Sequence, residues 1–213
     1  MRNERIAVIL FGKSKMNKES KQHLLDQITA DMLEQNVCPD LAKTATNIVP
    51  GAGNPDAKIM FVGEAPGKNE DLTGQPFIGA AGRILDGLLD HIGLTRGDVF
   101  ITSIVKYRPP NNRDPKPEEK AAFLPYLERQ IEVIQPALIA PLGRHGMESF
   151  LPGAKIGHVH GTLQHDASGR AIFPLYHPAV ALYNRNQLVI LEEDFLLIPK
   201  IIKQLEKEFK TSP

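Results

Sequence analysis

Four short apolar runs, with helical stretches between most of them, constrain the fold of this sequence most strongly. They span residues 58–62, 99–105, 137–142 and 171–176. Runs of this length are typical of buried strands, and strands that alternate with helices form a parallel sheet covered on both faces. The pattern predicts an α/β fold, a three-layer α/β/α sandwich around a central, mostly parallel, four-stranded sheet.

Helical periodicity fills the remainder of the chain. Apolar side chains recur at roughly helical spacing over residues 17–36 and again over 117–134. A third apolar stripe near the C terminus is interrupted by Pro199, which predicts a kink or two short helices there. We expect residues 1–213 to form one domain, with residues 1–36 as an N-terminal helical extension.

Composition excludes several classes of protein. The 25 basic residues balance the 25 acidic residues, so no global field favours a nucleic acid or a membrane, and any such contact must be local. Cys38 is the only cysteine, which excludes an intrachain disulfide. The apolar run from Ile6 to Phe11 is too short for a secretion signal. We expect a cytoplasmic monomer without a membrane partner.

Three loops concentrate glycine, proline, asparagine, histidine and charge. They span residues 63–82, 106–118 and 177–187, after the first, second and fourth predicted strands. The carboxyl ends of parallel strands are where open α/β sheets bind ligands. The first loop carries two acids, Glu64 and Glu70, which are free to play different roles: one orients backbone while the other faces a ligand.

An aromatic residue of the first loop, together with cations and a histidine in the other two loops, adds to these candidates. Phe77, also in the first loop, is an aromatic that needs a stacking partner. Four cations stand on the proline-stiffened second loop, which suits phosphate contacts or an ordinary solvated surface. His177 follows the fourth strand and is locked by the next proline, so it is a good donor to a ligand. The sequence His158-Val159-His160 has no nearby acid or cysteine, and we predict no metal site.

These loops resemble the motifs of one enzyme family. Residues 63–79 are similar to the first motif of the family-four uracil-DNA glycosylases, residues 101–115 to their central motif, and residues 176–179 to their last. The resemblance runs in order from about residue 38 to residue 185. It implies the uracil-DNA glycosylase fold and hydrolysis of the N-glycosidic bond of a flipped uracil, or a related deaminated base, in DNA.

The resemblance also implies roles around the flipped base. Phe77 would stack on the base, and His177 with the backbone N–H groups around Glu64 and Ala65 would donate to its carbonyl oxygen. Glu70 would position the water or stabilise the sugar cation.

The same resemblance implies contacts with the rest of the DNA. Lys106, Arg108 and Arg113 would bind phosphates. The segment 179–185, which ends at Arg185, would fill the gap in the duplex, with Leu182 or Tyr183 as the wedge.

Two departures from the family pattern matter. The family usually holds a four-iron cluster with four cysteines, but Tyr107 and Phe123 stand at two of those positions and only Cys38 remains. One thiolate cannot hold such a cluster, so we predict no iron and no other cofactor, with apolar packing of Tyr107 and Phe123 in its place. Ser103 replaces the asparagine that reads uracil's polar edge, which predicts uracil selectivity weaker by one or two powers of ten.

Three alternatives remain open at this point. One is a damaged-base binding module of the same fold that flips a base but cuts weakly or not at all. Another is an enzyme for a different base, such as hypoxanthine. The third, a nucleotide-binding or structural α/β protein, explains the two acids but not the ordered trio of motifs.

Overall fold

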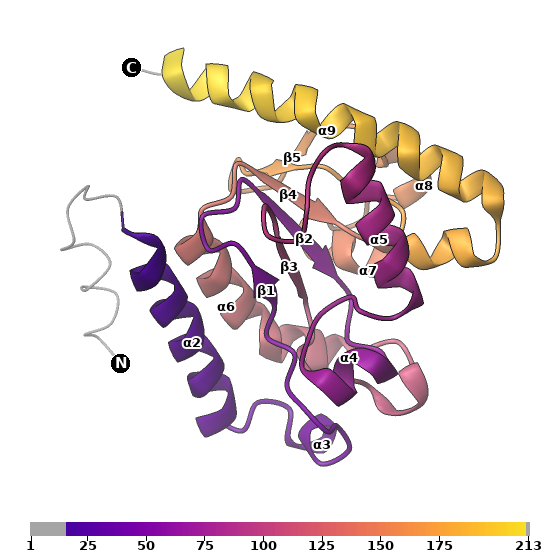
Figure 1. Cartoon of the computed structure of the whole chain (residues 1–213). Coiled ribbons are helices and arrows are strands. Elements are labelled where there is room, and N and C mark those ends of the chain that lie inside the picture. The colour runs from indigo at the N-terminus through magenta and orange to yellow at the C-terminus, as the bar shows by residue number, and fades with distance from the viewer. Residues whose placement is uncertain (1–15, 212–213) are drawn as a thin grey trace.

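The computed structural model describes residues 16–211 and contains a central sheet between layers of helices (Figure 1). The strand order is β1-β3-β2-β4-β6-β5. The strands are β1 (Ala52–Gly53), β2 (Ile59–Gly63), β3 (Phe100–Ser103), β4 (Leu138–Pro141), β5 (Gln164–His165) and β6 (Ala171–Ile172).

The four predicted strands form the parallel centre of this sheet. β3, β2, β4 and β6 pair in parallel, whereas β1 and β5 pair antiparallel with β3 and β6 at the two edges. The expected four-stranded sheet is therefore confirmed as a core, but the whole sheet has six strands and is mixed. Each added edge strand has two residues, which is too short to produce a recognisable sequence period.

Helices account for most of the other elements. They are α2 (Lys18–Glu34), α3 (Pro39–Ala42), α4 (Lys68–Thr73), α5 (Ala80–His91), α6 (Pro117–Ile134), α7 (Gly143–Glu148), α8 (Ile156–Val159) and α9 (Arg185–Thr211), with short 3-10 turns at Pro110–Asn112 and Pro178–Leu182. Pro199 lies inside α9, so the expectation of two separate helices is wrong. Burial of apolar side chains such as Leu191 and Phe195 holds the helix together past the lost hydrogen bond.

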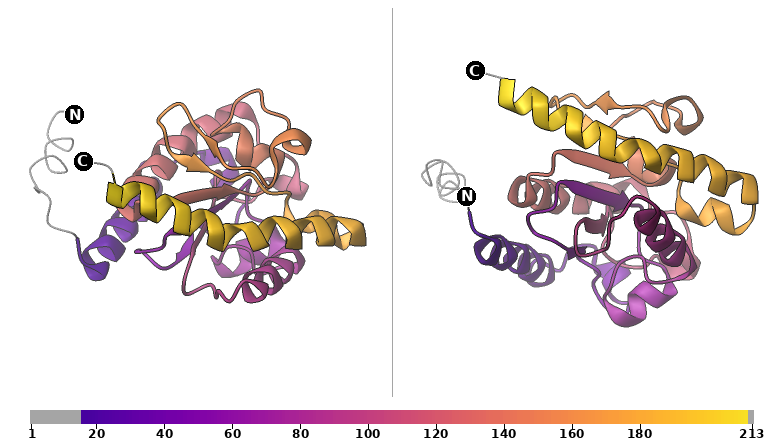
Figure 2. Two further views of the ribbon diagram at one scale, coloured as in Figure 1. Left: turned by 90° about the horizontal axis from the view of Figure 1, so that it is seen from above. Right: turned by 45° about the horizontal axis from the view of Figure 1, so that its top comes forward.

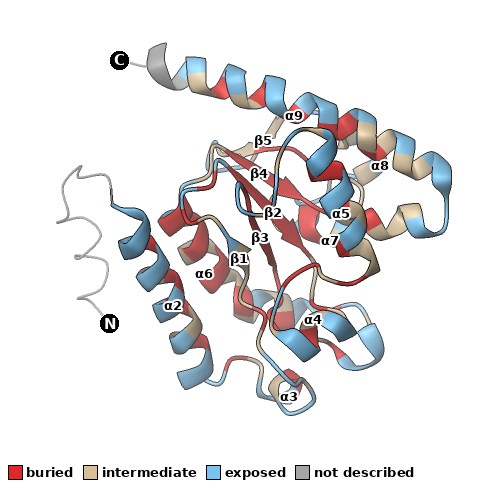
Figure 3. Cartoon of the chain, in the orientation of Figure 1, coloured by how far each residue is buried: buried red, intermediate tan, exposed pale blue. Residues whose placement is uncertain are grey.

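Alternating side chains of β2 build the core on both faces of the sheet. Met60 and Val62 belong to the apolar cluster that α2 and α6 cover. Ile59 and Phe61 belong to the opposite cluster under α5 and α9, where the Phe61 and Phe195 rings stack at 5.7 Å. Helices lie on both faces of the sheet (Figure 2). The strands are accordingly buried while the outer faces of α2 and α9 are exposed (Figure 3). This arrangement is the predicted three-layer sandwich.

The N-terminal helix α2 is joined to the rest of the fold. It packs against α6, and Lys21 Nζ donates to the carbonyl oxygen of Ile134 at 3.1 Å and pairs with Asp56 at 2.9 Å. Residues 1–15 of the predicted extension lie outside the described residues. Within residues 16–211, no helix is both long enough and apolar enough to cross a membrane.

Candidate active site

The carboxyl ends of the parallel strands meet at one edge of the sheet, and the predicted loops gather there. β2 ends at Gly63 and β3 ends at Ser103, and these two residues are register partners. Loop 64–79 continues from β2 and loop 104–116 from β3, while the third loop begins at His177 (Figure 1). Side chains from distant parts of the chain therefore share this edge.

Phe77 lies at the centre of the site. Its backbone has φ of +52°, in the left-handed region that non-glycine residues rarely adopt. Its ring packs so tightly over Gly63 that a Cβ atom there would lie 2.6 Å from the ring, so this end of β2 requires glycine. The Phe77 and His177 rings are 5.6 Å apart and tilted by 33°. The predicted aromatic and the predicted histidine therefore form one wall of the site.

His177 is held in its neutral form with a defined tautomer. Its Nδ1 atom accepts a hydrogen bond from the Ala179 N–H at 3.2 Å, which leaves the ring proton on Nε2. Desolvation lowers the pKa of His177 to about 4, although the nearby Glu70 carboxylate acts in the opposite direction. A Cβ atom at Gly143 would lie 3.0 Å from the His177 Cβ, so the glycine after β4 allows this close approach. His177 can therefore act as an uncharged donor.

Glu70 orders the loop that carries Phe77. Its Oε1 atom accepts hydrogen bonds from the Ile78 N–H at 2.9 Å and the Gly79 N–H at 2.8 Å. Oε2 accepts no hydrogen bond from any residue in the described range 16–211, and it lies 2.9 Å from where a Cβ atom of Gly67 would be. One oxygen thus fixes the backbone, and the other is available to a water or a substrate.

Glu64 lies beside a second group of titratable side chains. Its Oε1 atom is buried without a hydrogen-bond partner in the described structure, 3.8 Å from His145 Nε2, which is itself 3.1 Å from Asp114. Burial raises the pKa of Glu64 to about 7, and the Asp114 charge adds to this shift. The three could ligate a cation, but Arg144 and Lys120 already face the His145 ring nitrogens at 2.9 Å and 3.5 Å. We therefore assign no metal to this group.

We expect Glu64→Gln to remove a pH-dependent loss of stability. Because the pKa of Glu64 is higher in the folded state than its usual value of 4.5, the folded state binds more protons between pH 4.5 and about 7. The free energy of unfolding must then fall as pH rises through this window. Glutamine does not titrate, so the variant should keep the unfolding free energy that wild type loses in this window. Between pH 4.5 and pH 7 that loss is up to about 3 kcal/mol. Urea denaturation at several pH values in this range measures the unfolding free energy of both proteins. If the two plots of unfolding free energy against pH were parallel, the raised pKa of Glu64 would be contradicted.

Lys106 corrects one of the sequence predictions. Its side chain is fully buried, and its Nζ atom donates to Thr102 Oγ1 and the Ser103 carbonyl at 2.6 Å and to Gln130 Oε1 at 2.8 Å. Desolvation lowers its pKa to about 7. The predicted phosphate contact by Lys106 is therefore wrong. The lysine instead fixes the end of β3, where the buried Ser103 lies beside the Phe77 ring and Gly63.

The remaining predicted DNA contacts differ in availability. Arg113 forms a bidentate pair with Glu119 at 2.9 and 2.6 Å, so its guanidinium is already engaged. Arg108 is partly exposed and donates to Asn112 at 2.7 Å, and Arg185 is exposed at the start of α9. The structure therefore leaves Arg108 and Arg185 more accessible to phosphates than Arg113.

The two predicted wedge residues project from the turn after His177. Leu182 is 47% exposed and Tyr183 is 90% exposed, so both side chains are accessible from solvent. Ala65, at the opposite loop, is half-buried, and its backbone N–H has no hydrogen-bond partner in residues 16–211. The side chains of Leu182 and Tyr183 and the N–H group of Ala65 are therefore available to contact a ligand at this edge.

The residues at the family's cluster positions pack as an apolar group. Tyr107 and Phe123 are buried and meet edge to face with ring centroids 5.9 Å apart, as predicted. The Cys38 Sγ atom lies 3.8 Å from the Glu119 carbonyl oxygen in the same region, and burial raises the pKa of its thiol. A single protonated thiol beside two aromatic rings does not fit a four-iron cluster.

Phe123→Ala should destabilise the fold without touching the site. The ring is fully buried against Tyr107, so its removal leaves a cavity that the surrounding helices cannot fill. Such truncations cost about 3–5 kcal/mol. Denaturant unfolding measures the loss, and a cost below about 1 kcal/mol would show that this group is not structural. Phe123→Leu, which retains most of the apolar volume, is the matched control.

The segment after β4, which forms helix α7, was not among the predicted site segments. Gly143 of this helix allows the close approach of His177, and His145 of the same helix approaches Glu64. The sequence did indicate a further site segment here, because Gly143-Arg144-His145-Gly146 follows a predicted parallel strand, as the three predicted loops do. The His-Val-His motif has a different explanation, since His160 Nδ1 pairs with Asp194 of α9 at 2.8 Å.

Comparison with known proteins identifies the family of this chain. The family model described as "Uracil DNA glycosylase superfamily" matches residues 50–204. The chain is 46% identical to a type-4 uracil-DNA glycosylase of Sulfurisphaera tokodaii over 83% of this chain and 84% of the relative. It is 44% identical to the Archaeoglobus fulgidus type-4 enzyme over 83% and 92%, and 41% identical to that of Thermotoga maritima over 82% and 93%.

Proposed function

Because this chain belongs to the uracil-DNA glycosylase superfamily, we propose that it hydrolyses the N-glycosidic bond between uracil, or a related deaminated base, and deoxyribose in DNA. The observation that carries the proposal is the convergence of Phe77, His177 and Glu70 at one edge of the sheet. An aromatic ring, a neutral donor and a carboxylate are the groups that this hydrolysis needs.

Access to the base requires that the nucleotide leave the duplex. Leu182 and Tyr183, exposed on one turn, fill the space that the flipped nucleotide vacates. The base then stacks on Phe77, an interaction worth about 1–3 kcal/mol that does not depend on base identity. Arg108 and Arg185 contact the phosphates on either side, as cations do in most DNA complexes.

Bond cleavage moves charge in opposite directions. The C1′–N1 electron pair goes to the uracil ring, so negative charge grows on its O2 oxygen and positive charge on the sugar. The His177 Nε2–H and the free Ala65 N–H donate to that oxygen, and neutral donors of this kind stabilise it without first binding a proton. The Glu70 Oε2 atom stabilises the sugar cation and orients the water that attacks C1′. The water oxygen bonds to C1′, and the proton that it loses neutralises the uracil anion, so that the products are the abasic sugar and neutral uracil.

Ser103 sets the base preference within this scheme. It lies beside Phe77 and Gly63, where its single hydroxyl replaces an amide's donor and acceptor pair. A bidentate base contact contributes about 1–3 kcal/mol of discrimination. Uracil therefore remains a substrate with weaker discrimination against other deaminated bases.

Single-turnover excision from oligonucleotides that contain uracil, thymine, hypoxanthine or xanthine tests the proposal. Alkali cleavage reports the abasic product, and a gel shift on the same DNA reports binding. We expect abasic sites from uracil, smaller amounts from hypoxanthine or xanthine, and none from thymine. A shifted band without an abasic product would instead identify the damaged-base binding module.

A further inference from the structure

The loop that carries Phe77 is held by charged side chains from two sides. Glu70 accepts from the N–H groups of the two residues after Phe77. On the other side, Arg96 Nη1 donates to the Pro76 carbonyl oxygen at 2.9 Å, and Nη2 donates to the Phe77 carbonyl oxygen. One side chain thus binds the amides of this turn, and the other binds its carbonyl groups.

The turn needs such restraint because its backbone is unfavourable. A left-handed conformation costs an L-residue about 1–2 kcal/mol, and Phe77 has φ of +52°. The Phe77 carbonyl also lies against the first turn of α5, where a Cβ atom at Gly82 would be 1.6 Å from its oxygen. Without a donor, this carbonyl would lack a partner, and the turn would relax toward ordinary backbone angles. The ring would then move away from His177.

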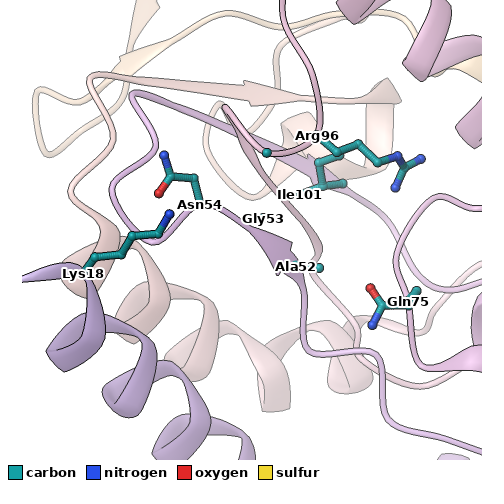
Figure 4. Close-up of a pocket in the computed structure, with 8 residues that line it drawn as sticks. Lys18, Ala52, Gly53, Asn54, Gln75, Arg96 and Ile101 are labelled. Carbon is teal, nitrogen blue, oxygen red and sulfur yellow. The ribbon is translucent and has the colours of Figure 1, made fainter.

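Arg96 itself is anchored and can be reached from solvent. Its Nε atom donates to Asp86 of α5 at 2.5 Å. Its side chain lines a cavity of about 320 Å³ together with Gln75, which precedes Pro76 in the chain (Figure 4). Arg96 therefore contacts the Phe77 turn through its guanidinium and also borders an open space.

We infer that Arg96 is a positioning residue for base excision, because its guanidinium holds the Phe77 turn in the strained conformation that presents the ring to the flipped base. This inference rests on the proposed function. Arg96 does not touch the base, so it acts on the reaction through Phe77. It stabilises the stacking platform in the free protein and leaves the DNA contacts of Arg108 and Arg185 unchanged.

Chemical rescue tests the inference. Arg96→Ala removes the guanidinium and leaves a gap that opens into the cavity. We expect the single-turnover rate for uracil excision to fall about 10-fold to 100-fold, the size of loss that a displaced catalytic group produces. The Kd for DNA should change little. Tens of millimolar guanidinium chloride should restore part of the rate, whereas urea or sodium chloride at matched concentration should not. If guanidinium failed to restore the rate, the proposed role of Arg96 in holding the Phe77 turn would be contradicted.

A double-mutant cycle separates positioning from general stability. In a Phe77→Ala background the same Arg96→Ala change should have no further effect on the rate, because the platform through which it acts is absent. A full additional loss in that background would overturn the inference. Arg170→Ala is the matched control, since Arg170 pairs with Asp166 and Glu128 far from the turn. It should lower stability while leaving the excision rate unchanged.

Hydrogen exchange gives a readout that does not depend on catalysis. Amides within residues 74–82 should exchange faster in Arg96→Ala, and guanidinium should slow them again. Unchanged exchange in this segment would contradict the inference. If wild type released no base from any oligonucleotide, the proposed function would fail, while the exchange result would still decide whether Arg96 holds the turn.

Discussion

Replacing His177 with alanine should lower the single-turnover rate of uracil excision by about 10²–10³-fold, the usual effect of removing one donor to a developing oxyanion. The donor is the Nε2–H, because Nδ1 accepts from the Ala179 amide. Its contribution requires a neutral ring, and desolvation, which lowers the pKa to about 4, keeps the ring neutral near pH 7. Quenched-flow or gel assays with excess enzyme measure this rate directly.

The pH dependence of the His177 variant provides an independent check. Because the folded-state pKa lies below the usual value of 6.5, the unfolded chain binds the extra proton first. The unfolding free energy of wild type should therefore fall as pH drops from 6.5 toward 4. His177→Ala should lack the part of this fall that is due to His177. The control is His165→Ala, which removes an exposed histidine from edge strand β5 and should leave the excision rate unchanged. Full-rate excision by His177→Ala would eliminate the proposed donor.

Glu70→Gln should reduce excision by about 10²-fold or more, in the range of a lost catalytic carboxylate. The amide keeps one oxygen that can accept from the Ile78 and Gly79 N–H groups, so the Phe77 turn should survive. What is lost is the negative charge that faces the sugar cation. Single-turnover rates for uracil DNA measure the loss.

Two comparisons define what Glu70 contributes. Glu70→Ala removes both the charge and the backbone acceptor, so it should be slower than Glu70→Gln and should also raise hydrogen exchange in residues 76–79. Glu148→Gln, which changes an exposed residue of α7, is the matched control and should retain wild-type activity. Wild-type cleavage by Glu70→Gln would show that no carboxylate is needed.

Local sequence patterns were enough to predict the centre of the fold. The four apolar runs became the four parallel strands, and 117–134 became α6 with the same bounds. The short elements were not predicted, because two-residue strands such as β1 and four-residue helices such as α3 have no measurable period. Of the two alternatives predicted at Pro199, the two short helices did not form, because tertiary burial outweighed the local penalty and α9 continues through the proline.

The site was predictable to the extent that it follows strand ends. Phe77, Glu70 and His177 were identified from their loops, and the structure places them together. Lys106 was misassigned, because the sequence shows a cation in a polar loop but not the three internal acceptors that bury it. Arg96 was missed, because it reaches the Phe77 turn only through packing around α5. His145 was missed although its segment follows a parallel strand, as the predicted loops do.

A crystal structure of this protein with free uracil would show whether Phe77, His177 and Glu70 surround one base. We expect the uracil ring to lie flat against Phe77, with its O2 oxygen within hydrogen-bond distance of His177 Nε2 and Glu70 on the side where the sugar would be. Uracil bound elsewhere on the molecule, or at this edge without contact to Phe77 and His177, would contradict it.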